Sequence, residues 1–377
     1  MSASAVMTPE GGSVRAGMAT WGGIPGTGYL AGYMPSAVEK GIKWFLDANE
    51  GRPAPAVVEA LAEMDSVEAI KRYPRATALE AEIERRPGAS VARLPAGSVL
   101  VTSGSDDAIA RACRVFLGRG DRLLVFEPSF EMFSISARLV GAEPVRLDWP
   151  EGTAFPLLAA IETAKRYAVK AVALATPANP TGSTASPEDI RSLADALPET
   201  SIWVDGAYGE FAARDTLAAA LSRPNLLAIR TFSKAYGLAG LRLGWVAGPP
   251  DRIGALRTAG APYPVGGLSV AAGLVARSEA GEAQMSVFVA RVKEERSMLL
   301  KLLSRLGART ASSEANFVFA RVRSAPDVKR RLAKAGIAIR TFAGRVGLED
   351  AIRVTCPGDA EGWEALDRAL RASEEWL

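Results

Sequence analysis

Histidine is absent from this 377-residue chain, and its absence excludes several kinds of catalytic site. Serine–histidine–aspartate and cysteine–histidine nucleophile systems both need an imidazole, so neither can operate here. Any proton transfer must instead use lysine, aspartate, glutamate, tyrosine or cysteine. Cysteine is also scarce: Cys113 and Cys356 are the only two, so we predict no zinc site, no disulfide framework and a reduced, cytoplasmic setting.

Long apolar runs and an excess of one charge are missing too. No stretch approaches the ~20 apolar residues that a membrane span needs. The net charge of +3 comes from 45 basic and 42 acidic residues, which predicts no nucleic-acid or membrane partner. Residues 1–28 are rich in glycine, serine, alanine and threonine and lack the apolar core of a signal peptide, so we interpret them as a loose arm.

From residue 98 onward, short apolar segments alternate with helical ones. Strands are predicted at 99–102, 123–126, 171–175, 202–204, 227–230 and 243–247. This alternation predicts an α/β fold with a mainly parallel sheet and helices on both faces. Beyond residue 262 a long charged helix and three short strands predict a smaller α+β domain. We therefore predict a large cofactor-binding domain over 51–261 and a small C-terminal domain over 262–377, with the N-terminal segment 29–50 as part of the small domain.

The stretch Thr231-Phe232-Ser233-Lys234 follows one of these strands, and Arg242 comes eight residues after the lysine. A lysine forms a Schiff base only if part of its population is neutral, which requires a sheltered site. Two hydroxyls and a guanidinium can bind a phosphate. An aldehyde cofactor that carries a phosphate, pyridoxal 5′-phosphate, would use all of these groups. The alternative is an exposed lysine in a turn whose serine caps a helix.

Polar residues also follow three other predicted strands, and ligands of open α/β sheets bind where strands end. The segments are Gly104-Ser105-Asp106, Asn179-Pro180-Thr181-Gly182, and Asp205 with Tyr208 three residues later. Taken singly, each has a structural alternative, since serine and aspartate cap helices and Asn-Pro-Thr-Gly forms turns. Their occurrence together and in this order favours a single ligand site.

The order and spacing of these motifs resemble the fold-type I pyridoxal-phosphate aminotransferases of class I/II, and within them the histidinol-phosphate aminotransferase group. The resemblance covers residues 30–377. The motifs that carry it, besides those above, are Leu46-Asp47-Ala48-Asn49-Glu50, Arg72-Tyr73-Pro74, Pro128-Ser129-Phe130-Glu131-Met132-Phe133, Ala315-Asn316-Phe317, Arg340 and Arg353.

This resemblance implies a set of cofactor contacts. Lys234 would hold the cofactor covalently and transfer the proton. Asp205 would pair with the ring nitrogen and keep it protonated. Asn179 and Tyr208 would bind the ring's phenolic oxygen, and Phe133 would stack on the ring.

The resemblance also implies a phosphate site and a dimer. Backbone N–H groups near Gly104, Ser105 and Asp106 would bind the phosphate at a helix N-terminus. Thr231, Ser233 and Arg242 would complete that site. Tyr73 would reach it from the partner subunit, which implies a homodimer with shared active sites.

For the substrates, the resemblance implies that Arg353 binds the α-carboxylate of glutamate and that Arg340 binds the phosphate end of histidinol phosphate. Tyr33 and Asn49 are the further substrate-binding candidates. The alternative for both arginines is that they are solvated charges at strand ends.

We therefore predict a homodimeric aminotransferase that converts histidinol phosphate and 2-oxoglutarate in histidine biosynthesis. Two segments depart from the family pattern: residues 49–53 match its Asn-Glu-Asn-Pro turn only in part, and Pro357 stands where glycine is usual. Four alternatives stay open: an aromatic or broad-specificity aminotransferase, a decarboxylase resembling threonine-phosphate decarboxylase, a cyclase of secondary metabolism, and a non-catalytic regulatory module that binds the cofactor.

Overall fold

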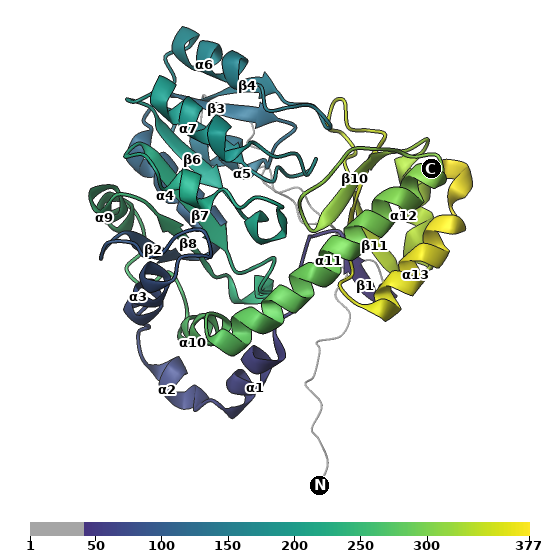
Figure 1. Ribbon diagram of the computed structural model, residues 1–377, viewed down its shortest axis with the longest axis horizontal. Helices are drawn as coiled ribbons and strands as arrows, with labels where there is room; N and C mark the ends of the chain where they lie inside the picture. The colour runs from purple at the N-terminus through teal and green to yellow at the C-terminus, as the bar shows by residue number, and fades with distance from the viewer. Residues whose placement is uncertain (1–40) are drawn as a thin grey trace, which may run out of the picture. The chain divides into compact units, whose positions relative to one another are not determined.

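The computed structural model describes residues 41–377. The predicted arm at 1–28, the part of the 29–50 segment before residue 41, and Tyr33 lie outside the described residues. The described part contains a sheet of seven strands and a sheet of five, with helices packed beside each (Figure 1). Within it, no helix is both long and apolar enough to cross a membrane.

The seven-stranded sheet has the strand order β2-β8-β7-β6-β5-β3-β4. Its strands are β2 (Val99–Thr102), β3 (Arg122–Glu127), β4 (Glu143–Asp148), β5 (Ala171–Ala175), β6 (Ser201–Asp205), β7 (Leu226–Thr231) and β8 (Gly244–Ala247). Strands β4, β3, β5, β6 and β7 are parallel along the sheet, and β8 is antiparallel to both β7 and β2. The sheet is therefore mainly parallel, as predicted.

Helices lie between and around these strands. They are α1 (Pro55–Glu63), α2 (Ser66–Lys71), α3 (Thr77–Arg85), α4 (Gly104–Phe116), α5 (Met132–Leu139), α6 (Leu157–Arg166), α7 (Pro187–Ala196), α8 (Leu217–Ala220), α9 (Pro250–Thr258) and α10 (Gly267–Ala276). The long helix α11 (Glu279–Arg305) follows, and then α12 (Ala325–Lys334) and α13 (Ala360–Arg371).

Both faces of the seven-stranded sheet are covered, because neighbouring residues of its strands enter different hydrophobic clusters. In β5, Ala171 and Ala173 pack in the cluster that contains residues of α4, α5 and α9. Val172 and Leu174 pack in the cluster that contains residues of α6 and α7. Side chains alternate between the faces of a strand, so a strand buried on both sides is apolar throughout. This explains why continuous apolar runs marked these strands in the sequence.

The five-stranded sheet has the order β1-β11-β12-β10-β9. Its strands are β1 (Trp44–Leu46), β9 (Arg309–Thr310), β10 (Phe317–Arg321), β11 (Ile337–Thr341) and β12 (Ala351–Thr355). Strand β1 pairs in parallel with β11, although about 290 residues of chain separate them, whereas the other pairs are antiparallel. Helices α11, α12 and α13 pack beside this sheet (Figure 1). The predicted fold class is thereby confirmed, while the domain boundaries stay a prediction.

Most of the predicted elements are present, and two of the missed ones, strand β4 and helix α2, lie at the surface. The strand predicted at 99–102 is β2, and the long charged helix predicted beyond residue 262 is α11. Strand β4 was missed because it lies at the edge of the sheet, and half of its residues Glu143–Asp148 are polar and none is buried. Helix α2 is short and exposed, so it too lacks the apolar pattern that marks a core element.

Candidate active site

Several strands of the seven-stranded sheet end at the same edge. The parallel strands β3, β5, β6 and β7 share one direction, and β2 shares it because both β2 and β7 are antiparallel to β8. Gly244, the first residue of β8, pairs with the last residues of β2 and β7, Thr102 and Thr231. The polar segments that follow these strands are thereby collected at one edge, as the sequence predicts for a ligand site.

The N-terminus of α4 lies close against this edge. A Cβ atom at Gly244 would lie 2.7 Å from the carbonyl carbon of Gly104 and 2.9 Å from the nitrogen of Ser105, so only glycine permits the approach. Arg242 has a left-handed backbone (φ 50°), which is costly for a residue other than glycine. Its Nη2 donates to Oδ2 of Asp106 at 3.1 Å. A guanidinium therefore lies beside a helix N-terminus, a combination that binds anions.

Two hydroxyl groups from the end of β7 extend this anion-binding arrangement. Thr231 and Ser233 are both buried, and their hydroxyl oxygens lie 3.0 Å apart. The backbone N–H of Ser233 donates to Oγ1 of Thr231 at 3.1 Å, which fixes the turn. Helix N–H groups, two hydroxyls and one guanidinium are the donors that a phosphate monoester requires.

Lys234 lies at the same edge in a sheltered position. Its Nζ donates to the carbonyl oxygen of Ala48 at 2.9 Å and lies 6.0 Å from the centroid of the Tyr208 ring. Burial, together with the positive charge of Arg353, lowers the pKa of Lys234 from 10.5 to about 8. A lysine with this pKa has a substantial neutral fraction near neutral pH, which a nucleophilic amine needs.

The backbone of the Lys234 turn packs against the segment that follows β1. A Cβ atom at Gly51 would lie 1.8 Å from the carbonyl oxygen of Lys234. A Cβ atom at Gly237, which has φ +68°, would lie 2.0 Å from the carbonyl carbon of Arg52. Both glycines are thus required by the close contact of two backbones. Gly51 belongs to the stretch where the sequence departs from the family's Asn-Glu-Asn-Pro turn.

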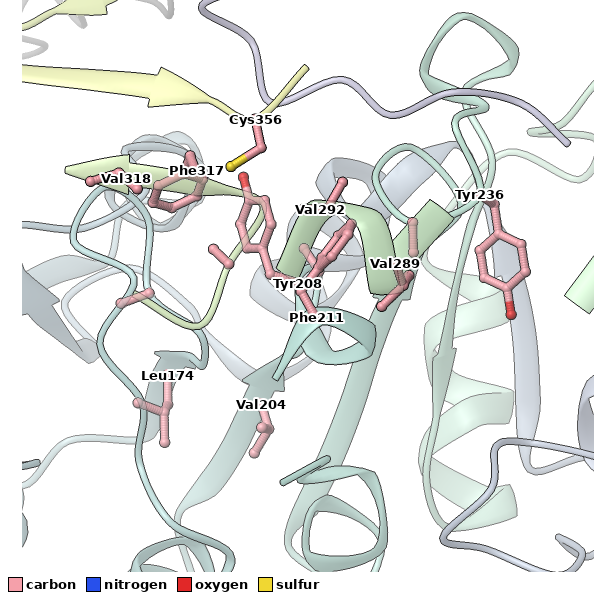
Figure 2. Packing of buried hydrophobic residues seen from close by; sticks show 14 of the residues in the cluster. Leu174, Val204, Tyr208, Phe211, Tyr236, Val289, Val292, Phe317, Val318 and Cys356 are labelled. Carbon is pink, nitrogen blue, oxygen red and sulfur yellow. The ribbon is translucent and has the colours of Figure 1, made fainter. Parts of the chain in front are cut away.

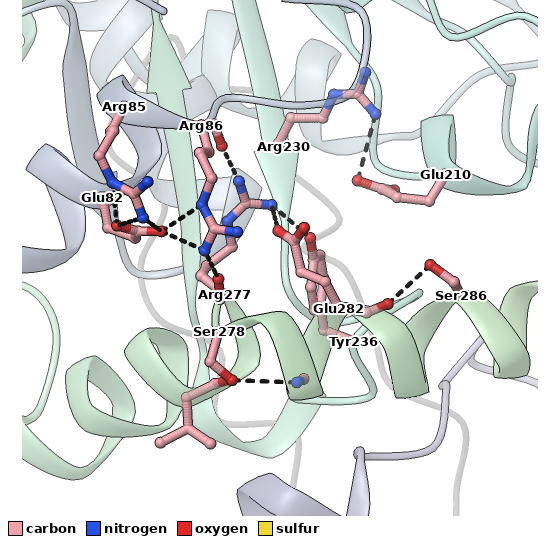
Figure 3. A network of polar contacts seen from close by, with 12 residues as sticks. Glu82, Arg85, Arg86, Glu210, Arg230, Tyr236, Arg277, Ser278, Glu282 and Ser286 are labelled. Atoms are coloured by element: carbon pink, nitrogen blue, oxygen red, sulfur yellow. Dashed lines mark hydrogen bonds and ion pairs between the residues drawn. The ribbon is translucent and has the colours of Figure 1, made fainter. Parts of the chain in front are cut away.

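A buried polar network supports the same turn and was not predicted. The hydroxyl of Tyr236 accepts a hydrogen bond from Nη1 of Arg277 at 2.8 Å, and Arg277 forms an ion pair with Glu282 at 2.6 Å. Arg277 also donates to the backbone carbonyl of Arg86, and Arg86 donates to that of Arg277 (Figure 3). Burial raises the pKa of Tyr236 to about 12, so the phenol stays neutral at physiological pH.

Asp205, the last residue of β6, is a buried carboxylate with 4% of its surface exposed. Its Oδ1 accepts a hydrogen bond from the N–H of Ala207 at 3.0 Å. Burial nevertheless raises the pKa of Asp205 from 3.8 to about 7. A buried carboxylate of this kind favours a partner that brings a positive charge or a proton, such as a protonated ring nitrogen.

Tyr208 lies at the meeting point of the two sheets. Its ring is 5% exposed and packs edge to face on Phe317 of β10, with ring centroids 5.2 Å apart. Figure 2 shows the hydroxyl end of Tyr208 directed toward Phe317 and Cys356. The side-chain Nδ2 of Asn49 donates to this hydroxyl at 2.9 Å.

Arg353 of β12 joins segments from three parts of the chain. Its Nη1 donates to Oδ1 of Asn179 and its Nη2 to the carbonyl of Asp47, both at 2.5 Å. The guanidinium carbon lies 5.3 Å from the centroid of the Phe317 ring, and the residue is 7% exposed. Arg340 of β11 is the direct Cα partner of Arg353 across the antiparallel pair. Directly opposed residues project to the same face of a sheet, so the two arginines are neighbours.

The structure brings most of the predicted site residues to this edge. Phe133, in contrast, is fully buried in the cluster that also contains residues of α4 and α9, so its stacking role stays a prediction. Tyr73 is 78% exposed and stacks on Tyr263, with ring centroids 4.6 Å apart. Sequence reasoning did not single out Gly51 or Thr355. The departure from the family turn was the one local signal for Gly51, and nothing local marked Thr355.

Among residues 41–377, no group of three or more cysteine, aspartate or glutamate side chains is arranged to hold a metal ion. The arrangement instead combines a sheltered lysine, a buried carboxylate and an anion-binding helix N-terminus at the strand ends of a mainly parallel sheet. These features define an α/β protein whose site suits a phosphorylated aldehyde.

Comparison with known proteins gives the family. The sequence profile of the family described as aminotransferase class I and II matches residues 41–370. The chain therefore belongs to the aminotransferase class I and II family.

Individual relatives agree with this assignment. A histidinol-phosphate aminotransferase from Symbiobacterium thermophilum is 36% identical over 87% of this chain and 90% of that protein. One from Ruegeria sp. is 35% identical over 86% of this chain and 89% of that protein. The crystal structure of histidinol-phosphate aminotransferase from Sinorhizobium meliloti in complex with pyridoxal-5′-phosphate superposes with a TM-score of 0.80, at 25% identity, over 89% of this chain and 91% of that chain.

Proposed function

We propose that this chain is a pyridoxal-phosphate-dependent aminotransferase that takes histidinol phosphate as amino donor and 2-oxoglutarate as acceptor. The observation that carries the substrate is the pairing of Arg340 with Arg353 on neighbouring strands. Two guanidinium groups on the same face of a sheet can bind two anionic groups, because each forms charge-assisted hydrogen bonds to a carboxylate or a phosphate. Glutamate, with two carboxylates, would engage both arginines, and histidinol phosphate, whose one anionic group is its phosphate, would engage Arg340.

The residues at the edge of the seven-stranded sheet fit pyridoxal phosphate. Thr231, Ser233, Arg242 and the N-terminus of α4 would hold its phosphate, and Asp205 would face its ring nitrogen. Lys234 would hold it covalently, because burial keeps part of this amine neutral. When bound, the cofactor supplies an aldehyde for the substrate's amino group and a ring that withdraws electrons from the α-carbon.

The protein's own groups would then perform the proton transfer. We assign this step to Nζ of Lys234, which would accept a proton from the α-carbon and return it to the cofactor. With a pKa of about 8, this amine can both accept and release a proton near neutral pH. Asp205, buried at the end of β6, would keep the ring nitrogen protonated, since an opposite charge close to a group favours its charged form.

The two arginines would orient the substrate. Arg353, which Asn179 and Asp47 hold in place, would bind the α-carboxylate of glutamate. Arg340 would bind the phosphate of histidinol phosphate or the second carboxylate of glutamate, one in each half-reaction. The guanidinium group of arginine can form two parallel charge-assisted hydrogen bonds to a phosphate or a carboxylate, which fixes the orientation of the bound group.

We also propose a cytoplasmic homodimer in which Tyr73 contributes to the partner's site. The side chains of Tyr73 and Tyr263 are exposed and stack on each other. An exposed aromatic pair of this kind is an argument for an interface with a second copy of the chain. Sedimentation velocity of the purified protein would test the oligomeric state.

The function is tested with a series of amino donors and 2-oxoglutarate. Histidinol phosphate is expected to give the highest kcat/KM, and phenylalanine and phosphothreonine much lower values. A higher value for phenylalanine would instead identify an aromatic aminotransferase. Release of carbon dioxide from phosphothreonine without any 2-oxo acid would identify a decarboxylase.

A further inference from the structure

Asn49 is buried, with 1% of its surface exposed, and adopts a left-handed backbone (φ 56°). All of its polar groups are bound within the protein. Its N–H donates to Oγ1 of Thr355 at 3.1 Å, its Oδ1 accepts from the same hydroxyl at 3.0 Å, and its carbonyl accepts from Nδ2 of Asn316 at 3.1 Å. Its Nδ2 donates to Tyr208 at 2.9 Å.

These contacts determine which way the Asn49 amide points. The Thr355 hydroxyl already accepts the N–H of Asn49, so its single hydrogen is directed to the amide oxygen of Asn49. The amide nitrogen must then face Tyr208 and can only donate to it. The hydroxyl hydrogen of Tyr208 is consequently directed away from Asn49. A hydroxyl on β12 thus sets the direction of a hydrogen bond made to Tyr208, which follows strand β6 of the other sheet.

The same strand also carries Arg353, two residues before Thr355. Arg353 binds the carbonyl of Asp47, and Thr355 binds Asn49, two residues further along the partner segment. Residues two apart in a strand lie on the same face, so the two contacts lie next to each other and both connect β12 to the segment after β1. A shift of the segment at Asn49 would therefore also displace the contact that Arg353 makes.

We propose that Asn49 and Thr355 are positioning residues that fix the Tyr208 hydroxyl and tie its place to the strand that holds Arg353. Neither residue touches the substrate in this role. A donor to the phenol oxygen strengthens the hydrogen bond that the phenol itself donates, because hydrogen bonds in a chain polarise one another. This inference rests on the proposed function, in which Tyr208 donates to the cofactor's phenolic oxygen.

The test measures the absorbance of the bound cofactor in the purified holoenzyme as a function of pH, and the midpoint is the pH at which half of the absorbance change has occurred. A hydrogen bond donated by Tyr208 favours the deprotonated state of the lysine nitrogen that holds the cofactor, so its loss raises the pH at which the absorbance changes. Asn49→Ala and Thr355→Val should each raise this midpoint, by about half a unit. Thr355→Ser keeps the hydroxyl and should restore the wild-type midpoint.

Two matched controls measure the effect of losing similar groups elsewhere. Asn225 is also buried, and its side chain donates to the carbonyls of Ala194 and Leu197, so Asn225→Ala removes an equally buried asparagine remote from the site. Thr310 lies in β9, an edge strand of the same sheet as Thr355. Asn225→Ala and Thr310→Val should leave the midpoint unchanged.

A double-variant experiment separates this inference from the proposed function. Tyr208→Phe alone should raise the midpoint by more than Asn49→Ala does, and adding Asn49→Ala to it should cause no further change. If Tyr208→Phe shifts the midpoint but Thr355→Val and Asn49→Ala do not, the positioning role is refuted and the proposed function stands. If Tyr208→Phe has no effect, the role of Tyr208 in the proposed function is wrong, and the inference is overturned with it. Thr355→Val and Thr355→Ser decide the matter even if Asn49→Ala does not fold.

Discussion

Replacing Asp205 by asparagine should stabilise the protein in the absence of cofactor, although the same change should remove most of its activity. The pKa of Asp205 rises from 3.8 to about 7 on folding, because the carboxylate is buried at the end of β6. Between about pH 4 and pH 7, the Asp205 carboxyl group is therefore protonated in the folded state and ionised in the unfolded state. As pH rises through this range, the aspartate costs the folded state an increasing free energy, and the full cost is reached above pH 7.

The size of the effect follows from the shift. One pKa unit corresponds to about 1.4 kcal/mol, so the stabilisation by asparagine should be about 2 kcal/mol near pH 5 and at most about 4 kcal/mol near pH 8. Asparagine can keep the hydrogen bond from the N–H of Ala207, since its side-chain oxygen accepts as the carboxylate does. Desolvation of the charge is then the main difference between the two residues.

Urea unfolding of the cofactor-free protein at the two pH values measures this difference. Asp195→Asn is the matched control, because Asp195 is exposed and its pKa is lowered by an ion pair with Arg223. That variant should show no gain at either pH. If Asp205→Asn were equally destabilised at both pH values, the hydrogen bond rather than the buried charge would govern this site. With cofactor bound, turnover by Asp205→Asn should fall greatly, since an amide cannot hold a ring nitrogen in its protonated form by charge.

Three further outcomes are expected. Borohydride reduction followed by peptide mapping should place the pyridoxyl label on Lys234, and a label on another lysine would contradict the site. Arg340→Ala should lower kcat/KM for histidinol phosphate by an amount equivalent to roughly 1.5–3 kcal/mol, and kcat/KM for phenylalanine much less. Equal losses for the two donors would argue against the phosphate role. Gly51→Ala should destabilise the protein by about 1–3 kcal/mol or more, because its Cβ would lie 1.8 Å from a backbone oxygen. Gly254→Ala is the control: nothing lies within 4 Å of a Cβ there, so alanine should stabilise helix α9 by about 0.5–1 kcal/mol. Thermal unfolding of both glycine variants would measure these changes.

The strands, the turns after them and the lysine could be predicted from the sequence because their signals are local. A strand buried on both faces is apolar along its whole length, as in β5, and polar residues directly after it mark its end. Helix α11 was predicted from a signal that is also local, a long segment with many charged residues. Family membership follows from the same local motifs in their order.

Tertiary structure alone decided how distant segments meet. Asn49 binds Thr355 across 306 positions of sequence, and neither residue type predicts the other. The pairing of Arg340 with Arg353 is a matter of strand register, which depends on how β11 and β12 pack rather than on their composition. The need for glycine at position 51 comes from the carbonyl of Lys234, 183 positions away in the chain.

The difference has a physical origin. Backbone conformation and hydrophobic period depend on neighbours in sequence, so they can be read along the chain. The direction of a buried hydrogen bond, the pKa of Asp205 and the shelter of Lys234 depend on groups that only folding brings together. The chain's order therefore determined which chemical groups are present at the strand ends, and packing of the two sheets determined their orientation and their charge.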